Sequence, residues 1–218
     1  MHEELKRKGK MKSKYSAELR AFALTLNFYS NKSYEYVRKT FKNLLPESST
    51  IRKWYRSING RPGFTDEVLQ ALRCKVQNTD KPIICNLVID EMSIRQQVEY
   101  DGNRYYGYED LGFNNCTNSD QPLQATSALV FMLVALNAHW KVPIGYFLIN
   151  SLNGKERASV LRNCLELLAK IDIHVHSLTF DGASVNVSMC KELGANFELE
   201  NLKPFFINPA TKESVLFF

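Results

Sequence analysis

The sequence predicts a mixed α/β chain in two parts, an all-helical N-terminal segment followed by a domain built on a β-sheet. The periodicity changes near residue 80, because apolar residues recur at helical spacing before it and gather in β-branched runs after it. The charge changes at the same place: residues 1–80 hold 17 Lys and Arg against 8 Asp and Glu, whereas the remainder holds 11 against 15. The hydrophobic share of 44% supports a sizeable core and excludes a wholly disordered chain.

The N-terminal segment begins with a charged tail, residues 1–14, which is expected to be disordered and whose basic cluster suits nuclear import. Helical spacing then predicts a first helix from Ser16 and a second helix capped by Ser33. A third short helix covers residues 49–58. A fourth helix, capped by Thr65, completes a helical DNA-binding region that we assign to residues 15–78.

The second and third helices have the size and separation of a helix-turn-helix. Such a unit needs one apolar side, here Ile51 and Trp54, and one polar side that meets bases and phosphates. Hydroxyls and free backbone N–H groups at a helix start also hold phosphate. The alternative is a small helical bundle with solvated charges. The residues assigned to DNA contact are Ser49, Thr50, Arg52, Lys53, Arg56 and Arg61.

The basic charge of this region favours a polyanionic partner, because each phosphate contact releases condensed counterions. Double-stranded DNA is therefore the predicted partner, and the helical region is also a candidate surface for homo-oligomer formation. The five cysteines contain no close pair, which favours free thiols in a reducing compartment. The longest apolar stretch, residues 128–138, is too short to span a bilayer, so an intracellular protein without a membrane partner is expected.

The second part, residues 82–218, alternates strands and helices in a defined order. An Asp101-Gly102 turn between two short strand-like runs predicts a hairpin, and residues 112–124 read as a loop. The order strand, strands, helix, strand, helix is that of an RNase H-like fold. A last apolar run, residues 213–218, would have to supply the fifth strand of the sheet. The other predicted elements are strands at 83–89, 125–137, 142–149 and 176–180, and helices at 154–171 and 184–193.

Two acids occupy the ends of strands in this order. Asp90 ends the first apolar strand, and Asp181 ends the fourth. Because these strands are neighbours in an RNase H-like sheet, we expect the two carboxylates to lie side by side, where a pair of Mg²⁺ or Mn²⁺ ions would bind them and cleave phosphodiesters. Glu91 is either an outward-facing neighbour or a helper. The alternatives are that Asp181 only caps the next helix, or that the chain is an unrelated α/β hydrolase.

Three motifs carry a resemblance to a known family: IDEMSI at 89–94, YGY at 106–108 and TFDGASVN at 179–186. Together they resemble the P-element transposase family, and the likeness extends from about Tyr15 to the end of the chain. The resemblance implies cut-and-paste DNA transposition, with DNA integration, in the nucleus. It also implies an RNase H-like core with three metal-binding acids, of which Asp90 is the first and Asp181 the second.

Three features that the resemblance implies are not found in these 218 residues. They are a third acid far downstream, an insertion domain associated with GTP binding, and an N-terminal zinc-coordinating finger. We therefore expect an incomplete RNase H-like domain, from a fragment or isoform, that is inactive alone and does not bind GTP. The expected function is that of a P-element-type DNA transposase, and the alternative is a domesticated DNA-binding protein with a non-catalytic RNase H-like scaffold.

Overall fold

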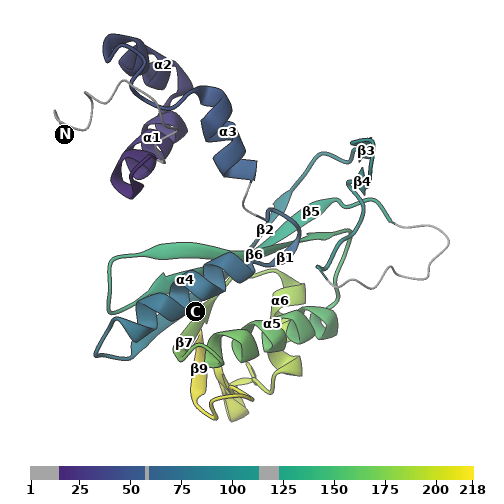
Figure 1. Cartoon of the computed structure of the whole chain (residues 1–218). Helices are drawn as coiled ribbons and strands as arrows, with labels where there is room; N and C mark the ends of the chain where they lie inside the picture. Colours follow the sequence, from purple (N-terminus) through teal and green to yellow (C-terminus); the bar gives the residue numbers. More distant parts are fainter. Residues whose placement is uncertain (1–14, 57–58, 113–122) are drawn as a thin grey trace. The chain divides into compact units, whose positions relative to one another are not determined.

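A computed structural model describes residues 15–56, 59–112 and 123–218 of the chain (Figure 1). The chain divides into two compact units, of which the first ends at Asn59 and the second begins at Gly60. No helix within the described ranges is long and apolar enough to cross a membrane.

The first unit contains three helices, α1 (Ala17–Tyr29), α2 (Asn31–Thr40) and α3 (Ser48–Arg56). The first helix was predicted to begin at Ser16, and the structure shows Ser16 as its cap, with α1 beginning at Ala17. The predicted cap of α2 was wrong by three residues. Ser30, not Ser33, has the extended backbone of a cap, and its hydroxyl accepts a hydrogen bond from the Ser33 N–H at 3.1 Å. A single residue therefore separates α1 from α2.

A small core holds these three helices together. It contains one buried residue from each helix and one from the turn before α3, namely Ala23 of α1, Tyr34 of α2, Leu45 of the turn and Ile51 of α3. The Tyr34 hydroxyl donates a hydrogen bond to the carbonyl of Pro46, which ties α2 to the residues before α3. The end of the third predicted helix, residues 57–58, lies outside the described residues.

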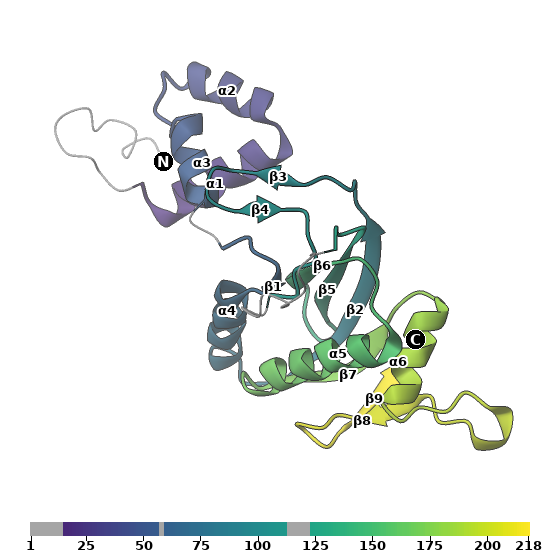
Figure 2. The ribbon, with the colours of Figure 1, turned by 90° about the vertical axis from the view of Figure 1, so that its right-hand side faces the viewer.

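The second unit is built on a mixed sheet. Within the described residues this sheet has the strand order β1-β6-β5-β2-β7-β9-β8, with a separate two-stranded hairpin, β3-β4 (Figures 1 and 2). The central part, β6-β5-β2-β7-β9, has the RNase H-like order. The strands are β1 (Gly63–Phe64), β2 (Ile83–Ser93), β3 (Glu99–Tyr100), β4 (Tyr105–Tyr106), β5 (Ser127–Ala135), β6 (Lys141–Ile149), β7 (Ile173–Thr179), β8 (Phe205–Ile207) and β9 (Ser214–Phe217).

The helix α4 (Asp66–Gln77) belongs to this second unit, which corrects the predicted boundary at residue 78. Leu72 of α4 is buried in the core of the sheet, and Val68 and Leu69 pack against the same core. The sequence predicted this helix but placed it in the N-terminal region, whereas its apolar residues pack on the core of the sheet.

Two helices follow the strands, α5 (Gly154–Ala169) and α6 (Ser184–Glu192). Alternation along β2 turns Leu87 and Ile89 toward these helices, where they are buried together with Leu161 of α5 and Met189 of α6. The core of the unit therefore lies between the sheet and α4, α5 and α6.

The apolar run near the C-terminus supplies the fifth strand, as the fold requires. β9 pairs with β7 in parallel, and Ser177 is aligned with Leu216. β8 then pairs with β9 in antiparallel, so the edge that would otherwise be open carries two further strands. The predicted Asp101-Gly102 hairpin is also confirmed, because Tyr100 of β3 pairs with Tyr105 of β4.

Candidate functional site

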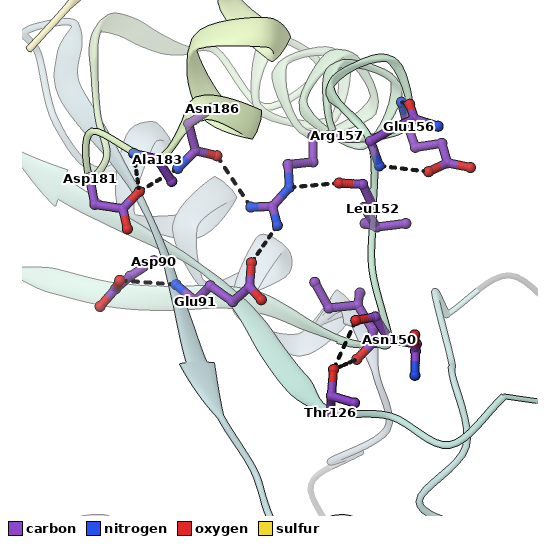
Figure 3. A network of polar contacts seen from close by, with 12 residues as sticks. Asp90, Glu91, Thr126, Asn150, Leu152, Glu156, Arg157, Asp181, Ala183 and Asn186 are labelled. Carbon is purple, nitrogen blue, oxygen red and sulfur yellow. Dashed lines mark hydrogen bonds and ion pairs between the residues drawn. The ribbon is translucent and has the colours of Figure 1, made fainter.

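The two predicted acids lie just beyond the paired part of two adjacent parallel strands. β2 and β7 pair directly, and Val88 of β2 is aligned with Thr179 of β7. Asp90 is two residues beyond Val88, and Asp181 is two residues beyond Thr179. The adjacency of these strands confirms the topological prediction, and Figure 3 shows the two acids with the polar groups around them. β2 does not stop at Asp90, however, but continues to Ser93 along β5.

Both carboxylates are held through one of their oxygens. Asp90 Oδ1 accepts a hydrogen bond from the backbone N–H of Glu91 at 2.9 Å. Asp181 Oδ1 accepts hydrogen bonds from Asn186 Nδ2 at 2.6 Å and from the backbone N–H of Ala183 at 3.3 Å. Asp181 therefore shapes the turn before α6, although Ala183 stands at the cap position of that helix. Both residues are exposed, and the bonds described here leave Oδ2 of each acid available.

A buried arginine that sequence reasoning missed lies next to this pair. Arg157 of α5 is 5% exposed, and its guanidinium forms an ion pair with Glu91. The same guanidinium donates from Nε to the carbonyl of Leu152 at 3.3 Å and from Nη1 to Asn186 Oδ1 at 3.2 Å (Figure 3). Its position before Val160 and Leu161, on the apolar stripe of α5, was a signal in the sequence that it is buried.

Glu91 points to the opposite face of the sheet from Asp90, because neighbouring residues of a strand alternate. That face is the one that α5 covers, and there Glu91 meets Arg157. The sequence left open whether Glu91 is an outward-facing neighbour or a helper. The structure shows it as the countercharge of the buried Arg157.

The basic residues of α3 lie as a recognition helix requires. Arg52, Lys53 and Arg56 are exposed, whereas Ile51 is buried and Trp54 half-buried. Thr50 is half-buried at the start of the helix. Arg61 is exposed, but it belongs to the second unit and not to α3.

Two acids that the sequence prediction did not consider lie next to the start of α3: Glu47, just before the helix, and Glu35 of α2. The Ser49 hydroxyl donates to Glu47 at 3.2 Å, and the Ser48 hydroxyl donates to Glu35. Arg38 lies 3.7 Å from Glu35 and 3.6 Å from Glu47. The hydroxyl of Ser49 is therefore already used within the unit, and a carboxylate stands where a phosphate was expected.

The fold and the acid pair define the class: an RNase H-like protein with a three-helix unit before it. The family model described as "TNP-like, RNase H N-terminal domain" matches residues 60–194, and "Transposable element P transposase-like, HTH domain" matches residues 1–54. The chain belongs to this family of P-element-type, transposase-like proteins. The two matches also meet where the structure divides, near residue 59.

Two known proteins show the same relationship. Human DNA transposase THAP9 is 34% identical over 200 residues, which are 90% of this chain and 22% of that protein, so the chain spans about a fifth of its length. The solved structure "Drosophila P element transposase strand transfer complex" matches with a TM-score of 0.71 at 20% identity. That match covers 100% of this chain and 44% of the other, and it shows a shared fold.

Proposed function

We propose that this chain provides the DNA-binding helices and the first two catalytic acids of a P-element-type DNA transposase. The reaction is metal-dependent phosphodiester hydrolysis and DNA strand transfer, carried out by the full-length protein. The observation that supports it best is the place of Asp90 and Asp181, at the same end of two adjacent strands, with the neighbouring Glu91 paired to Arg157.

The residues present fit Mg²⁺ or Mn²⁺ as part of a site. Carboxylate oxygens are the ligands that these hard cations prefer, and each acid keeps one oxygen outside its internal hydrogen bonds. Over the described ranges, no group of three or more His, Cys, Asp and Glu could hold a metal ion. Asp90 and Asp181 would therefore share the ions with DNA phosphate, water and the third acid that the family resemblance implies.

Bound divalent ions would polarise the phosphate and lower the pKa of the attacking water or 3′-hydroxyl. The contribution of this chain is to hold two negative side chains at one place on a rigid sheet. Two neighbouring carboxylates repel each other, and a cation between them removes that repulsion. The exposure of both residues leaves room for a DNA backbone.

Double-stranded DNA is the proposed partner, and it would be contacted by the exposed basic residues of α3 (Arg52, Lys53 and Arg56). A DNA substrate also places the proposed activity in the nucleus. Ser49 contributes less on this view, because its hydroxyl already donates to Glu47.

The test is DNA excision by full-length protein with Asp90→Asn or Asp181→Asn. Each substitution removes a metal-binding charge while keeping the shape of the side chain, so excision is expected to be abolished while DNA binding is unchanged. Asp172→Asn is the matched control, because Asp172 is an exposed acid before the opposite end of β7 and its left-handed backbone (φ 60°) suits Asn. Normal excision by either active-site variant would overturn the assignment.

The alternative is a domesticated DNA-binding protein with an inert RNase H-like core. It makes a different prediction in the same assay. Unmodified full-length protein would bind DNA but would neither nick nor join it in Mg²⁺ or Mn²⁺.

A further inference from the structure

We infer that Arg157 and Asn186 are positioning residues, which fix the orientation of the Asp181 carboxylate without touching substrate themselves. The importance of that orientation for metal binding rests on the proposed function. The orientation itself can be measured without metal.

The position of Arg157 is fixed from several sides. α5 begins with a capping box, in which Asn153 Oδ1 accepts from the N–H groups of Lys155 and Glu156 and the Glu156 side chain accepts from the Asn153 N–H. Gly154, the residue after Asn153, lies so close to α6 that a Cβ there would be 2.4 Å from Ser188 Oγ. The first turn of α5, which carries Arg157, is therefore held tightly against α6.

Burial then decides where the guanidinium must bind. A cation that is only 5% exposed needs a countercharge and acceptors for its remaining N–H groups. Glu91 of β2 supplies the charge, and Leu152 and Asn186 supply the acceptors. Arg157 thereby connects the strand that carries Asp90 to the helix that follows Asp181.

The direction of the hydrogen bonds explains how Arg157 acts on Asp181. A guanidinium can only donate, so the Asn186 amide must turn its Oδ1 toward Arg157. The NH₂ group of the same amide is then directed to the opposite side, where it donates to Asp181 Oδ1 at 2.6 Å. Asn186 is 5% exposed, so its amide has little freedom to turn over. The result is an Asp181 carboxylate with Oδ1 occupied and Oδ2 left for a ligand.

The first measurement uses the whole 218-residue chain without metal. Three-bond NMR couplings to the Asp181 carboxyl carbon report its χ1 angle. A single rotamer is expected in the unmodified chain, and averaging between rotamers is expected in Asn186→Ala. Asn208→Ala is the matched control, because Asn208 is also buried (2% exposed) and bonds locally, to the Ala210 N–H. It is expected to keep the single Asp181 rotamer.

A second variant protects the test if Asn186→Ala fails to fold. The double substitution Glu91→Gln with Arg157→Met removes the buried Arg157 charge together with its partner's charge, so neither charge is left unpaired. It leaves Asn186 in place but takes away the donor that orients it. Averaging of Asp181 is again expected, and a single unchanged rotamer in both variants would overturn the inference.

The second measurement adds Mn²⁺ and follows the paramagnetic broadening of the Glu91 and Gly182 amide signals. The Mn²⁺ concentration that gives half-maximal broadening is expected to rise about tenfold or more in both variants, as for other residues that orient metal ligands. Unchanged Mn²⁺ affinity despite a freed Asp181 would also overturn the inference. Absence of broadening in the unmodified chain would instead count against the proposed metal site, while the χ1 result would still decide the role of Arg157 and Asn186.

Discussion

Arg157 on α5 forms an ion pair with Glu91 on β2, sixty-six residues earlier in the chain. The pair joins a covering helix to the central strand of the sheet, at the residue next to Asp90. The guanidinium is almost fully buried, whereas the Glu91 side chain is 33% exposed. Water therefore offsets part of the cost of burying Glu91, and little of the cost of burying Arg157.

The first prediction concerns stability. Arg157→Ala should lower the free energy of unfolding by about 2–4 kcal/mol, because it leaves the Glu91 carboxylate and the Asn186 carbonyl without their donor. The double variant Glu91→Gln with Arg157→Met should cost less than this, because no charge is left behind. Urea titrations followed by circular dichroism measure both. If the double variant is less stable than Arg157→Ala, the unpaired Glu91 charge is not the reason for the loss of stability.

The second prediction concerns the register that aligns the acids. The pairing of β2 with β7 is irregular between Cys85 and Asn86, and at that point the Asn86 amide bonds to the hydroxyls of Ser177 and Thr179 at 2.9–3.2 Å. Asn86→Leu should lower stability by about 1–3 kcal/mol, because the buried Ser177 hydroxyl loses its acceptor. Hydrogen exchange of the β7 amides should accelerate with it.

The control for this substitution is Ile84→Leu, on the same strand and the same face. It exchanges one half-buried apolar side chain for another of equal volume, so β7 should exchange at its normal rate. Equal acceleration by the two variants would mean that the Asn86 amide has no special role in the register.

Much of the sheet could be predicted because its signals are local. The alternation of buried residues along β2, the Asp101-Gly102 turn and the change to helical spacing at Gly154 each act over a few residues. The adjacency of β2 and β7 followed from the topology alone, and it was enough to bring Asp90 and Asp181 to one end of the sheet.

The errors and omissions have a common physical cause, because they depend on partners distant in the sequence. The apolar face of α4 does not reveal whether it packs on a sheet or on other helices. Arg157 is ordinarily a surface residue type, and only the position of Glu91 in the fold makes its burial favourable. The cap of α2 is the exception. Ser30 and Ser33 both satisfy the local rule, and the backbone conformation decides between them.

The third prediction is a dependence on alkaline pH. Burial of the Tyr34 hydroxyl raises its pKa to about 12, above the usual value of 10. Between these values the folded unit retains a proton that the unfolded chain loses, so stability is complete below pH 10 and falls as the pH rises toward 12. Tyr34→Phe should cost about 1 kcal/mol at neutral pH, because the Pro46 carbonyl loses its donor, and should weaken this alkaline loss.

Trp54 fluorescence reports on the first unit alone once Trp140 is replaced by Phe, so urea midpoints at pH 7 to 11 give the comparison. The control is Tyr36→Phe, on the same helix but 73% exposed, which should change neither the neutral midpoint nor its slope with pH. If Tyr34→Phe loses as much stability at alkaline pH as the unmodified chain, groups other than Tyr34 cause that loss.

The last prediction concerns the charges of α3. If Arg52 and Arg56 each contact a phosphate, their joint replacement by Ala should reduce the slope of log K against log salt by about 1.8, at 0.9 per contact. Fluorescence anisotropy of double-stranded DNA with the whole chain measures that slope. Arg73→Ala, an exposed charge on α4, should change it little. Glu47→Gln should strengthen binding at low salt, because a carboxylate at the start of α3 repels phosphate. An unchanged slope for the α3 variant would remove this helix from the interface.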